Sequence, residues 1–289
     1  MQESVSKMSK TNKTEVAIPV QSTAEVAVAA MDAAMFAADA GQGMEGAGQE
    51  SFAIPFLGVL QKGSPTVDEA LPTYNPAHRA GMFFENVTGQ VFDGKAGVTI
   101  VPCSYRREFL RWGAKDAGGG FKGSYAPEVV AEMRASGEIV EVDGQLYVPL
   151  EDGTINDKKC DKFRDNRCHY VLILDEATGA WKEAVLSLSS TQIKKSKMLM
   201  SSLACVKFKN ASGQMFTPPT FANLVKVTSV GESNDKGTWF GYKFEITGVV
   251  SRQEVYAAAK AFHANVSSGA VAVKHESDTA ATPAQADGF

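Results

Sequence analysis

The chain has 289 residues, of which 44% are hydrophobic and 21% are charged, and its formal net charge is −4. This composition is ordinary for a folded protein. The negative net charge excludes a protein that binds polyanions over its whole surface, but it is compatible with a local basic site. Without a run of about 18 apolar residues no transmembrane helix is expected, and four cysteines do not suggest a disulfide scaffold.

The two ends of the chain differ in composition from the middle. Residues 1–50 are polar, then Ala-rich, then Gly-rich, which predicts a disordered or Ala-rich helical arm. Residues 51–268 hold most of the large apolar side chains and are expected to form a single domain. Residues 269–289 are small, polar and weakly acidic, which predicts a disordered tail. Since no secretory signal is recognised, we expect a cytoplasmic protein.

Apolar alternation and turn residues predict the strands of the folded domain. Residues 98–112 indicate one central strand, in which Pro102 requires a bulge or an edge position. Hairpins are expected before and after it, over 81–94 and 139–150. A run of three glycines predicts a loop over 113–123. The remaining strands are expected at 170–174, 181–188, 220–230 and 239–250, with a polar loop at 156–167 and a turn at 231–237.

Three helices are expected between and after these strands. They cover residues 126–136, 190–203 and 251–267, and Ser251 with Glu254 suggests a capping box at the start of the last one. Many short strands with few helices predict a mainly β, β-rich α+β fold. We expect a compact antiparallel sheet or small barrel with inserted helices and a C-terminal helix.

The central strand carries the first candidate binding residues. Side chains alternate between the two faces of a strand, so Tyr105, Arg107, Phe109 and Arg111 would share one face. Flat rings for stacking and cations for phosphates are what single-stranded nucleic acid requires. The alternative is an ordinary sheet strand with one apolar face and arginines that extend to solvent.

Basic charge is concentrated in three segments. Residues 190–210 contain five lysines and no acid, residues 158–167 five basic and two acidic side chains, and residues 103–115 four basic and one acidic. Each segment also holds a phenylalanine, which favours a polyanion groove over a plain solvated surface. Trp239, beside the expected turn, is a further stacking candidate.

Metal binding and catalysis have little support in the sequence. The spacing of Cys160, Cys168, His169 and Cys205 differs from that of zinc knuckles, and neighbours such as Cys168 and His169 would point to opposite faces. The usual catalytic motifs are absent from the sequence. Three aspartates could suggest the magnesium cluster of a nuclease, but we interpret them as solubilising charge in a polar loop; they are Asp157, Asp161 and Asp165. We therefore expect no cofactor, no metal and no enzyme activity.

The C-terminal residues suggest a second role. They include Glu276, Asp278 and Asp287 and end in Phe289. An acidic tail with a terminal aromatic can dock on a partner or compete with DNA for a basic groove. The alternative is a disordered end without a role.

Several segments are similar to single-stranded-DNA-binding proteins encoded by bacteriophages. They are IPFLGVLQKGSP (54–65), GMFFENVTGQVFDGKAGVTIVPCSYRREFLRW (81–112), CHYVLIL (168–174), SSTQIKKSKMLMSSL (189–203) and SNDKGTWFGYKFE (233–245). The tail also resembles that of the replication-associated binding proteins of short-tailed phages. The resemblance implies an elaborated OB-like antiparallel barrel that binds single-stranded DNA without sequence readout in phage replication, recombination and repair.

Residues and resemblance together define the expected site. The stacking candidates are Tyr105, Phe109, Trp112 and Trp239, and the phosphate-binding candidates are Arg106, Arg107, Arg111, Lys194, Lys195 and Lys197. Only one face of residues 105–112 can meet DNA, and which face does so is left open.

The expected partners are single-stranded DNA and, through Asp287 and Phe289, replication proteins. No membrane is expected, the oligomeric state is left open, and a phage-encoded chain would work in the cytoplasm of its host. The alternatives are a phage structural or assembly protein that contacts DNA, and an accessory nuclease.

Overall fold

The structure is a computed structural model that describes residues 36, 39–40, 42–47, 51–235 and 237–271. Contacts divide the chain into two units, Met1–Ala47 and Gly48–Phe289. In the first unit turns occur between residues 39 and 47, one of them closed by a hydrogen bond from the Gln42 amide to the Asp39 carbonyl at 3.1 Å. All elements below belong to the second unit. Most of the Ala-rich arm and the acidic tail with Asp287 and Phe289 lie outside the described residues.

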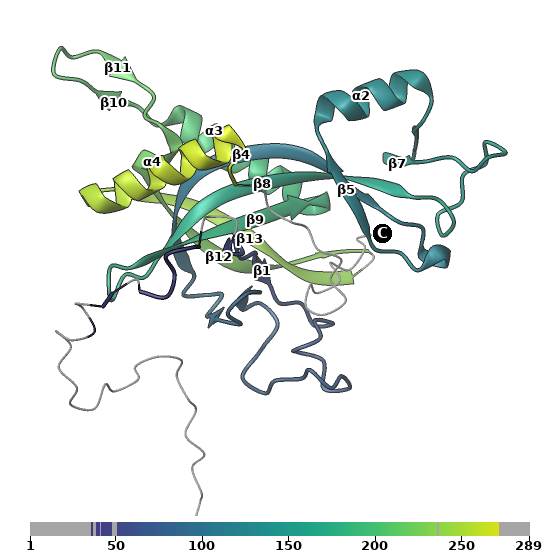
Figure 1. The fold of residues 1–289 in the computed structure, drawn as a ribbon, viewed down its shortest axis with the longest axis horizontal. Helices are drawn as coiled ribbons and strands as arrows, with labels where there is room; N and C mark the ends of the chain where they lie inside the picture. Colours follow the sequence, from purple (N-terminus) through teal and green to yellow (C-terminus); the bar gives the residue numbers. More distant parts are fainter. Residues whose placement is uncertain (1–35, 37–38, 41, 48–50, 236, 272–289) are drawn as a thin grey trace, which may run out of the picture. The chain divides into compact units, whose positions relative to one another are not determined.

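An eight-stranded antiparallel sheet is the largest element of the second unit (Figure 1). Its strand order is β13-β12-β4-β8-β7-β6, and β5 and β9 pair with β4 and β8. The strands are β4 (Val98–Trp112), β5 (Phe121–Tyr125), β6 (Val140–Val142), β7 (Gln145–Tyr147), β8 (Lys162–Leu174), β9 (Trp181–Ser189), β12 (Asn223–Asn234) and β13 (Gly237–Val249).

Two small sheets and three α-helices complete the described part of this unit. The three-stranded sheet contains β1 (Leu57–Val59), β2 (Phe83–Glu85) and β3 (Val91–Phe92), and the two-stranded one contains β10 (Phe208–Lys209) and β11 (Met215–Phe216). The helices are α2 (Pro127–Ser136), α3 (Ile193–Cys205) and α4 (Gln253–Ser268), with 3-10 turns η2 (Lys115–Ala117), η3 (Ser190–Gln192) and η4 (Thr220–Ala222).

This architecture confirms the predicted β-rich α+β class, its antiparallel pairing, the inserted helices and the C-terminal helix. The barrel part of the prediction is not found. Across residues 51–235 and 237–271 the strand order is an open path with β13 at one end and β6 at the other. Both β6 and β7 have only three residues, which leaves little backbone with which to pair β13.

The bulge predicted at Pro102 is confirmed in β4. The register with β8 shifts between Pro102 and Ser104, so that Cys103 is the additional residue. A bulge inserts an unpaired residue and increases the local twist. The proline can therefore sit inside a central strand opposite Val171.

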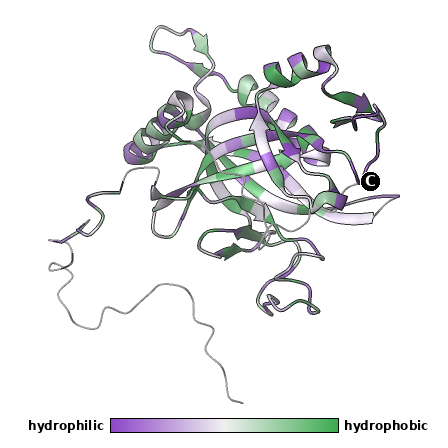
Figure 2. Cartoon of the chain, turned by 45° about the vertical axis from the view of Figure 1, so that its right-hand side comes forward, coloured by the Kyte–Doolittle hydropathy of each residue, from purple (hydrophilic) through white to green (hydrophobic). Residues whose placement is uncertain are grey.

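The helices α3 and α4 cover opposite faces of the sheet. Ile100 of β4 packs with Leu199 and Leu203 of α3, together with β1 and β2. The next residue, Val101, packs instead with α4, where Phe262 is buried. Consecutive residues of a strand point to opposite faces, which explains this division and the alternating colours along the strands in Figure 2.

A third apolar cluster lies beneath α2. Phe109 and Phe163, from β4 and β8, pack there against Val130, Ile139 and Leu146. Helix α2 begins with Pro127 in its first turn, as the sequence predicts. The cluster makes the outer ends of β4 and β8 part of a folded core.

Several predicted boundaries were wrong. Strand β8 begins at Lys162 rather than Tyr170, so the second half of the expected polar loop is sheet. Strand β5 begins inside the expected glycine loop, at Phe121. In both places pairing with the long strand β4 outweighs weak local propensity.

Two further local predictions were also wrong. β12 continues to Asn234, which reduces the expected turn to a tight connection between Asn234 and Gly237. Helix α4 has Arg252 rather than Ser251 at its N-cap and no side-chain capping bond, and Glu254 accepts a hydrogen bond from Arg252 instead.

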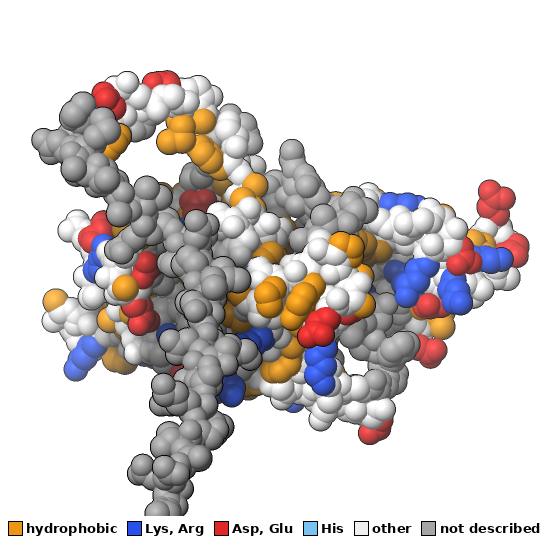
Figure 3. Space-filling model, turned by 90° about the horizontal axis from the view of Figure 1, so that it is seen from below, with side chains coloured by type: hydrophobic (Ala, Val, Ile, Leu, Met, Phe, Trp, Pro, Cys, Tyr) orange, Lys and Arg blue, Asp and Glu red, His pale blue; other side chains and the backbone are white. Residues whose placement is uncertain are grey.

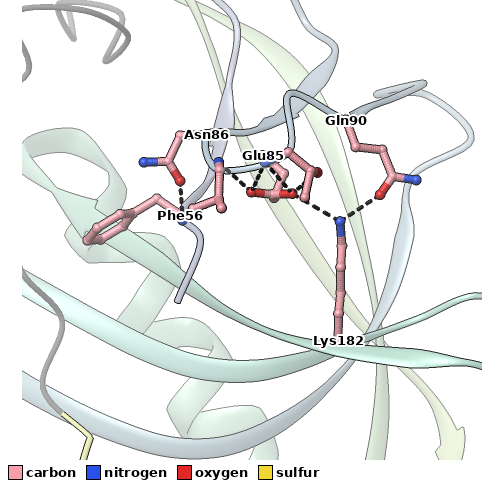
Figure 4. Close-up of polar contacts among 7 residues, drawn as sticks. Phe56, Glu85, Asn86, Gln90 and Lys182 are labelled. Atoms are coloured by element: carbon pink, nitrogen blue, oxygen red, sulfur yellow. Dashed lines mark hydrogen bonds and ion pairs between the residues drawn. The ribbon is translucent and has the colours of Figure 1, made fainter. Parts of the chain in front are cut away.

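A buried carboxylate connects the β2–β3 hairpin to β9 (Figure 4). Glu85 accepts hydrogen bonds from the amides of Val87 at 2.6 Å and Thr88 at 3.1 Å, and Lys182 Nζ lies 3.3 Å from it. Burial raises the pKa of Glu85, but these hydrogen bonds and the Lys182 charge bring it below its usual value. Lys182 also donates to Gln90 at 2.6 Å and so has a structural role.

Candidate nucleic-acid interface

The amino end of α3 meets the ends of β12 and β13 around one carboxylate. Glu232 Oε2 accepts hydrogen bonds from Trp239 Nε1 at 2.9 Å and Gln192 Nε2 at 3.1 Å. Lys195 Nζ lies 2.6 Å from the other oxygen, Oε1. We call this group, Gln192, Lys195, Glu232 and Trp239, the α3 corner. It brings together two residues that the sequence predicts, Lys195 and Trp239.

The backbone explains why these side chains meet. Glu232 and Trp239 are direct cross-strand partners, a position from which side chains on the same face interact. Gln192 is buried, and its Oε1 accepts a hydrogen bond from the Tyr242 amide at 3.0 Å. A Cβ at Gly241 would lie 2.6 Å from Glu232 Oε2 and 2.7 Å from Gln192 Nε2. Glycine at this position therefore gives both side chains their space.

Trp239 forms part of the wall of a pocket of about 310 Å³. Lys62 also lines this pocket, with its Nζ 3.4 Å from Thr238 Oγ1. Gln61 fixes the neighbouring backbone through hydrogen bonds with the amide and carbonyl of Phe240, at 2.8 and 2.9 Å. The indole is thus half-buried and oriented, and Lys62 lines the same pocket.

Electrostatics keep the carboxylate of this corner ionised. Burial raises the pKa of Glu232, but hydrogen bonds from Lys195, Gln192 and Trp239 lower it below its usual value overall. Glu232 neutralises Lys195 in the free protein. Glu232 and Gln192 were not among the residues predicted from the sequence, and the only signal for them was a carboxylate in the predicted turn, near Trp239, which follows it.

The outer face of α3 continues from this corner. We define it as Lys194, Lys197, Met198, Ser201 and Cys205, which are all exposed and follow helical spacing opposite the buried Leu199 and Leu203. Lys194 and Lys197 form no ion pair or hydrogen bond with the residues that the structure describes. No acid lies in the first turn of α3, and cations there oppose the helix dipole. The sequence therefore places charge where it does not stabilise the helix.

Tyr105 lies on the same side of the sheet as α3. Its ring centroid is 5.2 Å from that of His169, which forms a hydrogen bond to Ser196 of α3 at 2.8 Å. The Tyr105 hydroxyl accepts a hydrogen bond from Arg167 at 2.8 Å. Burial, followed by the Arg167 charge, lowers the pKa of His169 to about 4, so its ring is neutral near pH 7.

Arg107 shares this face but is already paired. Asp165 lies 2.8 Å from Arg107 and 3.0 Å from Arg167, and the Arg107 guanidinium covers the Phe109 ring at 5.0 Å. The contacts agree with the predicted shared face of Tyr105, Arg107 and Phe109. Arg107 retains an exposed guanidinium that could bind a phosphate only in competition with Asp165.

The remaining central-strand candidates are placed less favourably for a ligand. Phe109 is only 8% exposed and belongs to the cluster beneath α2. Trp112 packs on Phe121 with ring centroids 5.9 Å apart. Arg106 faces α4, where it donates to the Val266 carbonyl and lies over the Tyr170 ring. Phe109 and Arg106 therefore make internal contacts rather than forming a surface with Tyr105.

Arg111 is occupied by a buried carboxylate. Asp161 lies 2.7 Å from Arg111 and 2.9 Å from Lys122, and it accepts a hydrogen bond from the Ala114 amide at 3.0 Å. Burial raises the pKa of Asp161, but Lys122, Arg111 and Ala114 bring it below its usual value. The interpretation of Asp161 and Asp165 as solubilising loop charge was wrong, since both pair with arginines across the sheet. Figure 3 shows such mixed charge at the end where β5 and β7 lie.

The cysteine and histidine candidates do not converge. Cys168 packs toward α4 and donates to Glu108 at 2.9 Å, whereas its neighbour His169 faces α3. This confirms the prediction that they point to opposite faces. In the described part of the chain, no group of three or more His, Cys, Asp or Glu side chains could hold a metal ion.

None of the helices that the structure describes is long and apolar enough to span a membrane. Searches of curated proteins and of solved structures found no match to the chain. A family model described as Pam3 phage gp34-like protein matches residues 21–272. This match covers both the α3 corner and the central strand, and the chain is therefore a phage protein that belongs to the Pam3 phage gp34-like family.

Proposed function

We propose that the protein binds single-stranded DNA without sequence readout, by electrostatic capture and base stacking, in phage DNA replication, recombination and repair. The observation that carries the proposal is the half-buried Trp239, whose indole is held by the carboxylate that also binds Lys195, and which lines a pocket together with Lys62. An oriented ring with lysines in its neighbourhood suits an unpaired base and its flanking phosphates. A duplex keeps its bases stacked and offers no free base face to this ring.

The lysines of α3 have different parts in this proposal. Lys194 and Lys197 are exposed without partners among the described residues, so they can bind phosphates at no cost in broken ion pairs. Lys195 must leave or share Glu232 to do so. Each phosphate contact releases condensed counterions, so affinity should fall as salt rises.

The central strand has a smaller part than the sequence suggested. Tyr105 and Arg107 lie on the α3 side of the sheet and could extend the site. We do not assign DNA contacts to Phe109 or Arg111, because the first is in a core and the second is bound to Asp161.

The nuclease alternative is disfavoured by the aspartates themselves. Asp157 pairs with Lys162 at 2.6 Å, and Asp161 and Asp165 each pair with two cations. Carboxylates that are neutralised in this way are poor ligands for a divalent cation. The structural-protein alternative differs from our proposal in the expected ligand, since packaged DNA is a duplex.

A binding panel tests the proposal. Full-length protein would be titrated against labelled oligo-dT, duplex DNA of equal length and single-stranded RNA at two salt concentrations. We expect oligo-dT to bind at least about tenfold more tightly than the duplex, and more weakly at higher salt. Equal affinity for the duplex would instead favour a structural or assembly protein. No binding to any nucleic acid would refute both readings.

A further inference from the structure

A hairpin of unusual surface composition follows α3. Strands β10 and β11 project from the rest of the unit in both ribbon views (Figures 1 and 2). Met215 is 61% exposed and Phe216 is 44% exposed. The rings of Phe208 and Phe216 face each other edge-on across the two strands, with centroids 6.0 Å apart. Large apolar side chains on a projecting element indicate a contact surface.

The hairpin is held in shape by its own hydrogen bonds. At the tip the Asn210 side chain accepts from the Gln214 amide at 2.9 Å and from Ser212 Oγ at 2.7 Å. At the base Lys207 Nζ donates to the Ala204 carbonyl of α3 at 3.2 Å and to Thr217. The position of Phe216 is thereby tied to the carboxyl end of α3.

The sequence around the hairpin is basic throughout. Residues 184–231 contain six lysines and neither aspartate nor glutamate. Lys209 is exposed on the hairpin itself, and Lys207 is exposed directly before it. Exposed rings and thioethers in a segment whose only charged residues are lysines are complementary to a polyanion that also has apolar faces. Unpaired nucleic-acid bases on a phosphate backbone have this combination.

The outer face of α3 connects the hairpin to Trp239. Gln192 of the α3 corner directly precedes the helix, and the hairpin begins three residues after Cys205, at Phe208. A helix of 13 residues is about 20 Å long at 1.5 Å per residue. Along that length Lys194, Lys197 and Met198 are exposed and no acid interrupts them.

We propose that the β10–β11 hairpin is a second base-binding element of the same site. A single strand that stacks on Trp239 would follow the outer face of α3 and place later bases against Phe216 and Met215, with Lys209 at a phosphate. This inference rests on the proposed function and adds to it the direction of the strand and a dependence on its length.

Oligonucleotide length separates the two contacts. The full-length protein and the double variant Met215→Ser, Phe216→Ser would be titrated with oligo-dT of two lengths. An oligonucleotide of about six nucleotides is within the usual site size of one binding domain, and one of about twenty nucleotides exceeds it. We expect the variant to lose about tenfold in affinity for the long oligonucleotide and less than about twofold for the short one. Val129→Ser, which changes an exposed apolar residue of α2, is the matched control and should bind both as the wild type does.

A charge variant provides an independent readout. Lys209→Ala should lower the salt slope for the long oligonucleotide by about 0.7, whereas Lys260→Ala on α4, on the opposite face of the sheet, should leave it unchanged. Thermal unfolding would establish that each variant is folded.

Three results would overturn the inference. The hairpin variants could bind the long oligonucleotide as the wild type does, or lose affinity equally for both lengths. The hairpin could instead be required for binding vesicles that contain phosphatidylserine while DNA affinity stays constant, which would assign it to a lipid surface. If the wild type binds neither oligonucleotide, the proposed function itself fails, and that outcome is distinct from these three.

Discussion

Trp239 donates a hydrogen bond from its indole Nε1 to the carboxylate Oε2 of Glu232 at 2.9 Å. The two residues are cross-strand partners at the ends of β12 and β13, and the other oxygen of the carboxylate binds Lys195. One acidic side chain therefore orients the ring and holds the cation beside it. Substitution of Trp239 and substitution of Glu232 can therefore test the role of the ring and the role of the carboxylate separately.

Removal of the Trp239 ring tests stacking. Trp239→Ala should weaken oligo-dT binding by about 1–3 kcal/mol, and Trp239→Phe should recover part of this loss because it retains a flat ring. Intrinsic fluorescence or anisotropy titration would measure both. Trp181→Ala is the control, since Trp181 is an exposed tryptophan at the start of β9, outside the α3 corner. Equal losses for Trp181→Ala and Trp239→Ala would argue against a specific stacking site.

Glu232→Gln tests whether Lys195 is available to a ligand. A glutamine can still accept the indole hydrogen bond but cannot form the ion pair with Lys195. We expect tighter oligo-dT binding at low salt and a log–log salt slope steeper by about 0.7, the value of one additional phosphate contact. Affinities measured over a series of salt concentrations would show this. An unchanged slope would mean that Lys195 does not contact phosphate.

His169 predicts a loss of stability in mild acid. Its pKa is lowered to about 4 by burial and by the Arg167 charge, so the unfolded chain binds the proton more readily. The stabilising contribution is complete above the unfolded value of about 6.5 and disappears as the pH falls toward 4. We expect the free energy of unfolding to be about 2 kcal/mol lower at pH 5 than at pH 7 from this group alone.

Urea titrations at a series of pH values would measure this effect. His169→Gln has no titrating group and should show a flatter profile between pH 5 and 6.5, although its stability at pH 7 can be lower. Profiles with equal slopes for the wild type and the variant would show that His169 does not control the acid response.

Asp161 predicts a structural role for Arg111. Asp161→Ala would leave the partly buried Arg111 without its carboxylate. Removal of one member of a buried pair costs about 3–5 kcal/mol, and the partial exposure of Arg111 places the expected loss at the lower end of this range. The double variant Arg111→Met, Asp161→Leu should recover much of the stability because it leaves neither charge of that pair. Its affinity for oligo-dT should match that of the wild type. A large loss of affinity in the folded double variant would return Arg111 to the binding site.

Phe109 is expected to affect stability rather than binding. Its ring is 8% exposed in the cluster beneath α2, and a buried Phe→Ala change costs about 3–5 kcal/mol. Phe109→Ala should therefore unfold at lower urea concentration, while the folded fraction binds oligo-dT normally. Tyr105→Ala is the comparison on the same strand face, because its ring is only half-buried. Reduced DNA affinity with unchanged stability would restore Phe109 as a stacking residue.

Local rules were sufficient for much of the fold. Alternating apolar residues determined β4, the hairpins around 81–94 and 139–150, and strand β9. Pro102 required a bulge, and Pro127 began a helix. The sequence also concentrated acid-free basic charge at α3 and placed Trp239 near it. Each of these properties depends on residues that are close together in the chain.

Tertiary structure alone decided which of the candidate residues are exposed and not already paired within the protein. Arg111 and Asp161 are 50 residues apart in sequence, and Lys195 and Glu232 meet only because β12 passes the start of α3. A side chain's charge is encoded locally, but its neutralisation and burial depend on partners that distant parts of the chain supply. For this reason the sequence determined that Phe109 and Arg107 share a strand face, and only the packing of α2 and the position of Asp165 decided that the ring is buried and the guanidinium paired.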